Sequence, residues 1–168
     1  MNRQEILADI EALKERLNKL EKMYDSLTTP NKRWRAKKDD DYYFISAEGS
    51  AYLDRENEVI VDGLHYDIGN YFKTEEEAKF EVERLKVIAE LKEWATPISE
   101  FNWNDNTQKK YVIILENNYL RVDFFCSLQT CDLYFESREI AENAIEAVGK
   151  ERIIKYYFRR GENNADSN

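Results

Sequence analysis

Apolar residues recur with a heptad spacing over the first part of the chain. Between residues 6 and 27 they are separated alternately by four and three positions, which is the spacing of a coiled-coil seam. We therefore predict an oligomerisation helix over residues 1–28. Its core contacts would be made by Ile6, Ile10, Leu13, Leu17, Leu20, Tyr24 and Leu27.

The charges beside this seam favour a parallel homodimer. Asp9 precedes Lys14 and Arg16 precedes Glu21, each pair at the flanking heptad positions that meet across a parallel interface. The pattern leaves two alternatives open. One is antiparallel pairing, and the other is a single amphipathic helix that lies on its own body, with Leu7 widening the apolar stripe.

A charged segment over residues 29–41 follows as a linker. Pro30 ends the helix, and a run of cations around one tryptophan is followed directly by three aspartates. A solvated linker explains this composition best, but cations beside an aromatic ring could also hold a nucleotide or RNA phosphate. That contact would use Lys32, Arg33, Trp34 and Arg35.

The rest of the chain contains one pattern twice. Residues 71–78 and residues 134–141 share an aromatic pair, a hydroxyl residue, an acid and an alanine at matching positions. Upstream of each block a tryptophan, Trp34 or Trp103, precedes a short apolar segment that begins with tyrosine. We therefore predict two duplicated modules, residues 42–97 and residues 98–160, with a frayed tail over residues 161–168.

Within each module, alternation and turn residues predict short antiparallel strands followed by one helix. The fold class that we expect is thus α+β. In the first module we expect strands at 42–46, 50–53 and 59–61, a turn at Asp62-Gly63, a mixed segment at 64–68 and a helix from the Thr74 cap to Trp94. That helix should bury Ala78, Val82, Leu85, Ile88 and Ala89. In the second we expect strands at 110–116, 119–125 and 133–135, a helix from the Ser137 cap to Val148 and a last strand at 153–158.

Composition narrows the function. The chain has a net charge of −9, which divides into +4 over residues 1–38 and −13 over residues 39–168. Such a body should repel phosphate backbones, so we expect no direct nucleic-acid binding. No apolar run reaches membrane-spanning length and no signal-peptide core is present, so we expect a cytoplasmic protein without membrane contact.

Catalytic groups are missing from the pattern. His65 is the single histidine, and with Cys126 and Cys131 it cannot complete a zinc site in one subunit. No nucleophile and base pair or glycine-rich phosphate loop can be assigned, so we predict a non-enzyme without metal or cofactor. Exposed aromatic residues make good interface anchors, and the candidates for partner contact are Tyr43, Trp103 and Tyr157.

The two blocks together resemble small accessory proteins of Firmicutes phages and prophages. The resemblance covers nearly the whole chain and rests on these residues: Trp34, 42–45, 69–78, 84–87, Trp103, 134–135, 140–141, 144–145, 149–153 and 155–158. It implies a phage origin, action in the bacterial host cytoplasm and an accessory role. No settled activity is associated with this family, so no functional residue can be transferred from it.

These features lead us to expect a phage-encoded interaction protein that inhibits a host antiviral defence system, in the manner of an anti-CRISPR protein. Its partners would be a second copy of itself and a host or phage protein, such as a defence nuclease complex whose basic groove attracts an acidic body. One alternative is an oligomeric sponge that sequesters a nucleotide immune signal. Another is a phage regulatory or assembly scaffold.

Overall fold

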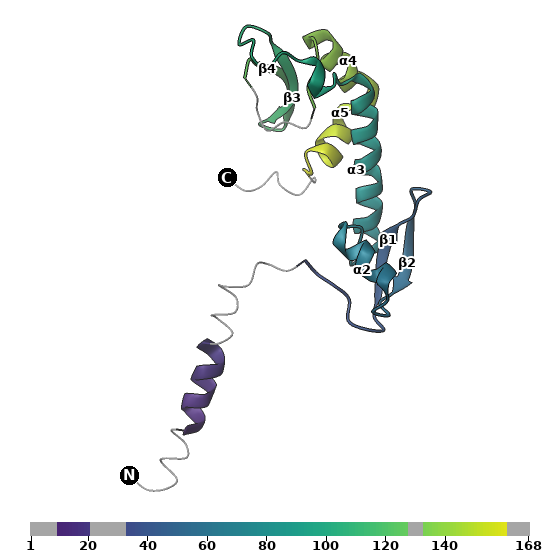
Figure 1. Ribbon diagram of the computed structural model, residues 1–168, viewed down its shortest axis with the longest axis vertical. Coiled ribbons are helices and arrows are strands. Elements are labelled where there is room, and N and C mark those ends of the chain that lie inside the picture. The colour runs from purple at the N-terminus through teal and green to yellow at the C-terminus, as the bar shows by residue number, and fades with distance from the viewer. Residues whose placement is uncertain (1–9, 21–32, 128–132, 161–168) are drawn as a thin grey trace. The chain divides into compact units, whose positions relative to one another are not determined.

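In the computed structural model, the described residues are 10–20, 33–127 and 133–160 (Figure 1). The chain divides into two compact units, residues 1–35 and residues 36–168. Four of the predicted oligomerisation and ligand-contact residues lie outside the described residues, as does the predicted tail over residues 161–168. They are Ile6, Tyr24, Leu27 and Lys32.

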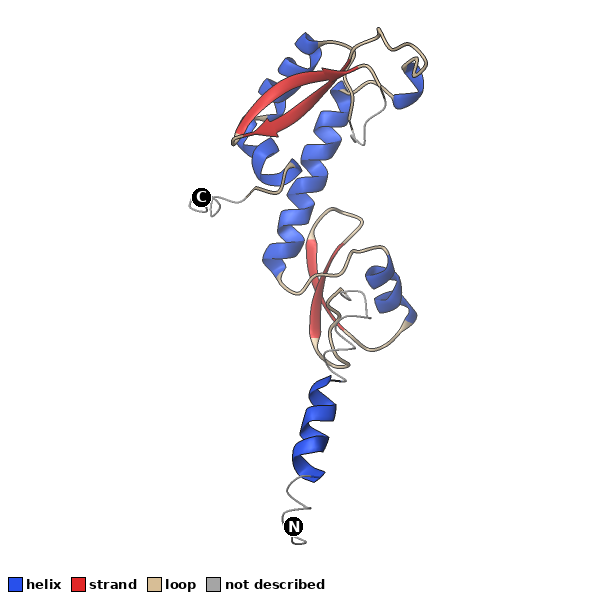
Figure 2. Cartoon of the chain, turned by 90° about the vertical axis from the view of Figure 1, so that its left-hand side faces the viewer, coloured by secondary structure: helices blue, strands red, loops and turns tan. Residues whose placement is uncertain are grey.

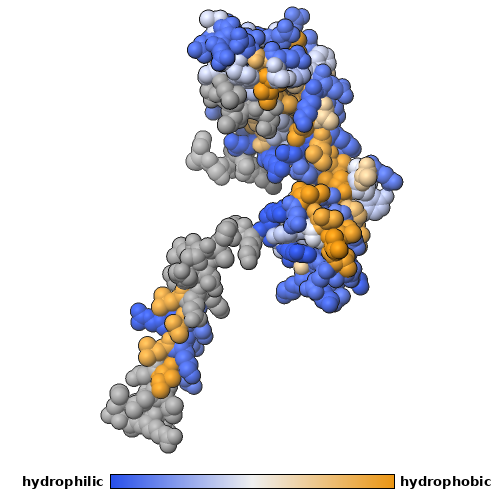
Figure 3. All heavy atoms as spheres, viewed as in Figure 1, coloured by the Kyte–Doolittle hydropathy of each residue, from blue (hydrophilic) through white to orange (hydrophobic). Residues whose placement is uncertain are grey.

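The first unit contains a helix over residues 10–20, which agrees with the helix expected from the heptad spacing. Its aliphatic seam residues form an orange row between blue residues in Figure 3. All four of these side chains are exposed: Ile10, Leu13, Leu17 and Leu20. The helix therefore presents an uncovered aliphatic stripe within the described part of the chain.

The second unit mixes helices with two small antiparallel sheets, as the α+β prediction requires (Figure 2). β1 (Asp41–Ile45) pairs with β2 (Ala51–Arg55), and β3 (Lys110–Glu116) pairs with β4 (Tyr119–Phe125). Asn117 and Asn118 join β3 to β4 with φ angles of 51° and 64°. Asparagine tolerates this left-handed region, so a two-residue turn can close the hairpin.

Each hairpin makes one further backbone pairing with a segment that precedes a helix. The amides and carbonyls of Tyr43 and Phe72 exchange hydrogen bonds of 2.9 and 2.8 Å. Those of Tyr111 and Phe135 do the same at 3.0 and 2.8 Å. The strand predicted over residues 133–135 is thus reduced, among the described residues, to isolated bridges, the second of which joins Tyr134 to Thr96.

The two main helices begin where the sequence places their caps. α3 (Glu75–Trp94) starts after Thr74, whose hydroxyl accepts the Glu77 amide hydrogen. α4 (Arg138–Val148) starts after Ser137, whose hydroxyl accepts the amide hydrogen of Ile140. These caps satisfy backbone donors that the first helical turn leaves unpaired.

The buried side of α3 differs from the predicted stripe. Leu85 and Ala89 are exposed, whereas Val82 is buried in the first half and Val87 and Leu91 are buried in the second. A five-residue step turns the buried face by roughly 140° around the helix axis. The helix packs on β1 and β2 in one part and on α4 in another, so no single stripe could serve it (Figure 1).

Residues 60–67 form a helix, so the predicted strand at 59–61 and the mixed segment at 64–68 were wrong. In α2 (Ile60–Asp67), the Asp62 carboxylate accepts amide hydrogens from Asn57 and Val59 and thereby fixes the first turn. Three consecutive apolar residues fit a strand or a helix equally well by pattern. The aspartate at the third helical position decides for a helix.

The final predicted strand at 153–158 was also wrong. After α5 (Lys150–Arg152) the chain continues as η2 (Ile153–Tyr157), a π-helical turn in which the Phe158 amide donates to the Ile153 carbonyl. Branched and aromatic residues suit strands, but here they pack into the core from a helical turn. Their burial, rather than a strand partner, is what the apolar run reflects.

The main core joins the second half of α3 to the β3–β4 hairpin, α4 and η2. Its buried members are Val87, Leu91, Ile113, Val122, Leu133, Phe135, Ala141, Ala144, Ile145, Val148 and Ile153. A smaller cluster beside it contains Phe101, which follows η1 (Ile98–Glu100), together with Val112 and Tyr134. Among the described residues, no helix combines the length and apolarity that a membrane crossing requires.

Candidate functional site

A buried polar cluster connects β1 to α2. The Tyr42 side chain is fully buried, and its hydroxyl donates to Oδ1 of Asp62 at 3.0 Å. Nδ1 of His65 lies 3.0 Å from the same hydroxyl, and since the hydroxyl has only one hydrogen, Nδ1 donates to its oxygen. Burial raises the pKa of Tyr42 well above its usual value, and the hydrogen bond to Asp62 adds to this shift.

A second buried carboxylate lies next to this cluster. Glu56 accepts a hydrogen bond from the Tyr71 hydroxyl at 2.9 Å and another from the Glu58 amide at 2.9 Å. The Tyr71 ring stacks on the ring of Tyr42, with centroids 3.9 Å apart and planes 7° apart. The two carboxylates are thus linked by a stacked pair of phenols.

The groups of this cluster have a structural role, which is to hold α2 in place. Asp62 is buried and accepts from one hydroxyl and two backbone amides, so protein donors already use its lone pairs. Glu56 is likewise buried and bonded. A buried, fully bonded carboxylate fixes its surroundings, because any movement leaves it without a partner. The cluster therefore fixes α2 against β1.

The opposite side of α2 is aliphatic and exposed. Ile60, Leu64 and Ile68 follow one another at a spacing of four and are 81%, 57% and 75% exposed. Figure 3 shows orange residues over α2. Val59 and Val61 beside them are half exposed. The only buried residue of this helix is its aspartate, so α2 is amphipathic with its apolar side turned outward.

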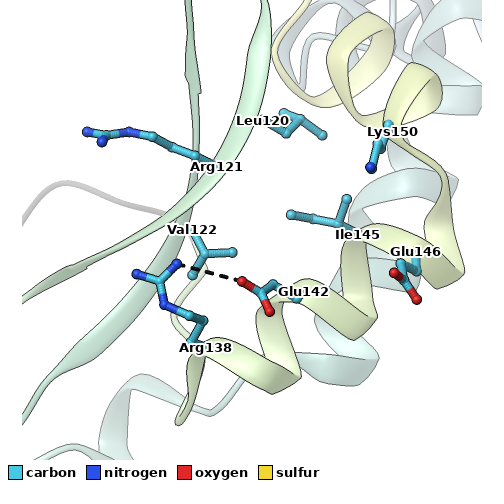
Figure 4. Close-up of a pocket in the computed structure, with 8 residues that line it drawn as sticks. All are labelled: Leu120, Arg121, Val122, Arg138, Glu142, Ile145, Glu146 and Lys150. Carbon is cyan, nitrogen blue, oxygen red and sulfur yellow. Dashed lines mark ion pairs between the residues drawn. The ribbon is translucent and has the colours of Figure 1, made fainter.

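A groove of about 350 Å³ lies between β4 and α4 (Figure 4). Leu120, Val122 and Ile145 line it with apolar side chains. On its rim, Arg138 forms an ion pair with Glu142 at 3.6 Å. Figure 4 shows the Arg121 side chain directed away from α4, and its guanidinium pairs with Glu116 at 3.1 Å and Asp123 at 2.9 Å. The charged residues of the lining have both signs, Arg121, Arg138 and Lys150 with Glu142 and Glu146, so the groove favours no one ligand charge and is a weaker candidate than α2.

The basic segment that the sequence proposed as a ligand contact lies at the end of the first unit. Arg33, Trp34 and Arg35 are exposed, and Trp34 is 40% exposed. Each of the three has an interaction within the chain. Their exposure keeps them accessible to a partner.

Trp103, which the sequence predicted as a partner contact, makes several contacts within the fold. It is half-buried, and its Nε1 donates to the Ile98 carbonyl at 2.9 Å. Its ring lies edge-on to Tyr134, and the ammonium of Lys110 stands 5.2 Å from its centroid. These contacts use the polar atom and one face of the indole inside the fold.

Lys110 is a buried cation that the sequence did not indicate. Its Nζ donates to the carbonyl oxygens of Asp105 at 3.2 Å, Gln108 at 3.0 Å and Cys126 at 3.3 Å. This ammonium therefore closes the loop before β3 onto the end of β4. Cys126 carries a free thiol, while Cys131 lies outside the described residues.

The remaining predicted contacts lie on separate elements. Tyr43 in β1 is half-buried and pairs through its backbone with Phe72. Tyr157 in η2 is half-buried against the main core, with its ring at 86° to that of Phe158. The three aromatic candidates of the second unit thus come from β1, the loop before β3 and η2.

The sequence analysis did not identify the α2 face, because residues 59–61 were predicted as a strand and the helical spacing of the apolar residues was not recognised. Ile60, Leu64 and Ile68 keep a four-residue spacing, which was a helical signal present in the sequence. An aspartate three positions after Val59 was a second such signal. Nothing in the pattern could indicate that the aspartate turns inward, since that depends on the distant Tyr42.

Among the described residues, no group of three or more His, Cys, Asp or Glu side chains is placed to hold a metal ion. Comparison with known proteins gave no match to any protein-family model, curated protein or solved structure.

Proposed function

We propose that this chain is a non-enzymatic phage interaction protein that works as a parallel homodimer and inhibits a host antiviral defence effector. The observation that carries the proposal is the exposed aliphatic row on the helix over residues 10–20. Leu13, Leu17 and Leu20 are each more than half exposed, at 65%, 56% and 54%. A soluble helix gains stability by covering such a row, and a second copy of the same helix fits it.

Charge supports the parallel arrangement. Arg16 precedes Glu21 and Asp9 precedes Lys14 in the sequence, at heptad positions where opposite charges of two parallel helices approach each other. Short coiled coils are marginal in isolation, so the body attached to each helix would add a dimer contact or a bound partner.

We also propose that the body is an internal duplication. Tyr43 with Phe72 and Tyr111 with Phe135 make the same pair of backbone hydrogen bonds at the edge of a hairpin. In each case a helix capped by a hydroxyl residue follows. The copies differ in that α2 lies between the hairpin and the paired residue in the first. A duplicated body offers two similar frames with different inserted surfaces.

Two features favour a defence effector as the partner. One is the negative charge of the body, and the other is the resemblance of the sequence to phage accessory proteins. Residues 39–168 carry −13, which complements the basic groove with which a nuclease holds nucleic acid. Binding there would require no catalytic group. The acidic body and the dimer together would occupy a surface and exclude its substrate.

Two measurements test this proposal. The native mass of the full chain, with a subunit mass of 20.1 kDa, should be that of a dimer, and a larger mass would carry the host target. Plasmid interference by bacterial hosts with different defence nucleases should fall in at least one host when the protein is expressed. A monomer would reject the coiled coil, and unchanged interference in every host would reject the inhibitor role.

Sequestration of a nucleotide signal is a second candidate, favoured by the exposure of Arg33, Trp34 and Arg35. Replacing Lys32, Arg33 and Arg35 together by Ala should then abolish retention of a small ligand, measured as mass lost from the native protein. If a ligand is retained equally by the variant, the basic segment is not its site.

A further inference from the structure

The α2 helix presents its apolar residues to solvent and its acid to the interior. Ile60, Leu64 and Ile68 are spaced as one helical face, and each is more than half exposed. Asp62 is 1% exposed. An ordinary surface helix has the reverse arrangement, with aliphatic residues inside and acids outside. Exposed aliphatic faces of this kind mark contact surfaces in folded proteins.

The helix cannot turn this face inward without breaking the buried cluster. Rotation about its axis would remove the Asp62 carboxylate from the Tyr42 hydroxyl and from the amides of Asn57 and Val59. It would also remove His65 from the Tyr42 hydroxyl. Because the buried side chains of Asp62 and Tyr42 would lose their partners, the outward orientation is fixed by the fold itself.

An aromatic surface continues from the helix onto the first hairpin. The His65 ring stacks on Phe44, with centroids 4.4 Å apart and planes 15° apart. Phe44 faces Tyr52 across the strands, with ring centroids 6.2 Å apart, and Tyr52 is 47% exposed. These rings lie on the side of α2 that faces the hairpin, so aromatic contacts hold the helix there together with the polar cluster.

The charges along this segment have one sign. Between Arg55 and Lys73 the chain has no Lys or Arg; its four acids are Glu56 and Asp62, which are buried, and Glu58 and Asp67. Glu58 and Asp67 are exposed at the two ends of α2. Glu58 forms an ion pair with Lys38, in which Nζ and Oε2 are 3.8 Å apart and both side chains are largely exposed. Solvent screens such a pair, so the ends of the α2 face are acidic.

The aliphatic centre of the α2 face and its acidic ends together decide which kind of partner fits. Nucleic acid and anionic lipid would meet acids where they need cations. Two α2 faces from two copies would bring like charges together at both ends of an antiparallel or parallel pair. An amphipathic helix with an aliphatic stripe between basic residues satisfies both the apolar centre and the acidic ends.

We propose that the α2 face binds an amphipathic helix of a partner protein whose aliphatic stripe is flanked by Lys or Arg. The inference rests on the proposed interaction role and specifies the surface and partner chemistry for it. The bound helix lies along Ile60, Leu64 and Ile68, and its cations approach Glu58 and Asp67.

Two designed peptides test this inference on the full chain. Both form a helix with Leu at positions i, i+3, i+4 and i+7, and they differ only in carrying Lys or Glu beside the stripe. Amide chemical shifts of the isotope-labelled protein should move in residues 60–68 with the Lys peptide. The Glu peptide should bind about tenfold or more weakly, and added salt should reduce this difference.

Substitutions assign the contact. Ile60→Ser with Leu64→Ser should weaken the Lys peptide about tenfold or more, because side chains at the centre of a contact dominate its affinity. Leu85→Ser removes a leucine that is 48% exposed on α3 and should leave binding unchanged. Circular dichroism establishes that each variant is folded. Ile60 is 81% exposed, so its replacement should not unfold the body.

Several results would overturn the inference. One is that neither peptide binds, and another is that both bind equally at every salt concentration. A third is that the control variant loses as much affinity as the α2 variant. If the α2 variant changes the native mass of the protein instead, the face is occupied by a second copy. Plasmid interference that still falls with the α2 variant would leave the proposed inhibitor role intact while rejecting the α2 face as its means.

Discussion

Arg152 and Glu90 meet through two parallel hydrogen bonds across 62 residues of sequence. Nη1 donates to Oε2 at 2.7 Å and Nη2 donates to Oε1 at 2.8 Å, which joins α5 to the second half of α3. The hydrogen bond from the guanidinium lowers the pKa of Glu90, and the carboxylate raises the pKa of Arg152. A bidentate contact fixes the relative orientation of the two side chains as well as the distance between them.

Replacing Glu90 by Gln should lower the free energy of unfolding by about 0.5–1 kcal/mol at pH 7, because both side chains are more than a third exposed and water screens them. Since folding lowers the Glu90 pKa from 4.5, its contribution is fully present above that value and is lost as the pH falls from there through the lower pKa of the folded state. Urea unfolding between pH 3 and pH 7 would measure the difference. Glu93→Gln, exposed on the same helix, should not change this slope.

Tyr42 gives the chain a sensitivity to alkali. Folding raises its pKa above the ordinary value of 10.0, so the folded state holds the phenol proton more tightly than the unfolded state. The free energy of unfolding should therefore fall as the pH rises above about 10. Tyr42→Phe should cost about 1–2 kcal/mol at neutral pH and flatten this fall. Tyr119→Phe, at a residue 78% exposed, should retain it; equal slopes in all three proteins would contradict the assignment.

Two glycines should respond oppositely to alanine. Gly149 ends α4 with φ of 96°, a conformation that disfavours a side chain, so Gly149→Ala should destabilise the fold by about 1 kcal/mol. Gly63 lies inside α2 with open space around its Cα, so Gly63→Ala should stabilise by about 0.5–1 kcal/mol. Thermal unfolding of both variants would compare the signs, and a loss in both would mean that α2 is not helical.

Lys110→Met should destabilise the second hairpin by about 2–3 kcal/mol, because three carbonyl oxygens lose a buried donor. Trp103 reports on the change, since its ring would lose the ammonium at 5.2 Å, and its fluorescence should shift. Lys109→Met is the control, because this neighbouring lysine is exposed. An unchanged stability of Lys110→Met would mean that water replaces the ammonium without cost.

Leu13→Asn with Leu17→Asn should convert the proposed dimer into a monomer, because amides at these positions remove the apolar contact between helices. Sedimentation over a range of concentrations measures this mass directly. Ala12→Asn, an exposed neighbour outside the seam, should leave the dimer intact. A dimer that survives the double substitution would place the contact elsewhere.

The elements that the sequence predicted well are those with local signals. Residues 110–116 and 119–125 were predicted as strands at the observed bounds, and the hydroxyl caps of α3 and α4 set where those helices begin. Alternation, a turn at Asn117-Asn118 and capping residues all act within a few positions. Such signals can be read without knowledge of distant contacts.

The elements that were mispredicted depend on distant partners. α2 is held by Tyr42, which lies twenty positions before Asp62. The apolar run at 153–158 is helical because its side chains pack against a core built from α3 and α4. The fold therefore overrides local preference at these two places. The α2 face, which is the best candidate site, was hidden for the same reason.

The division of α3 between its two halves has a consequence for cooperativity. Val82 is buried in the half that contacts the first hairpin, while Val87 and Leu91 belong to the core of the second. A cut at residue 97, the boundary predicted between the two modules, would remove from the second module the part of α3 that packs in its core. We therefore expect residues 42–97 and 98–160 to melt in a single transition and neither to fold when expressed alone. In that case the predicted module would not be the unit of folding.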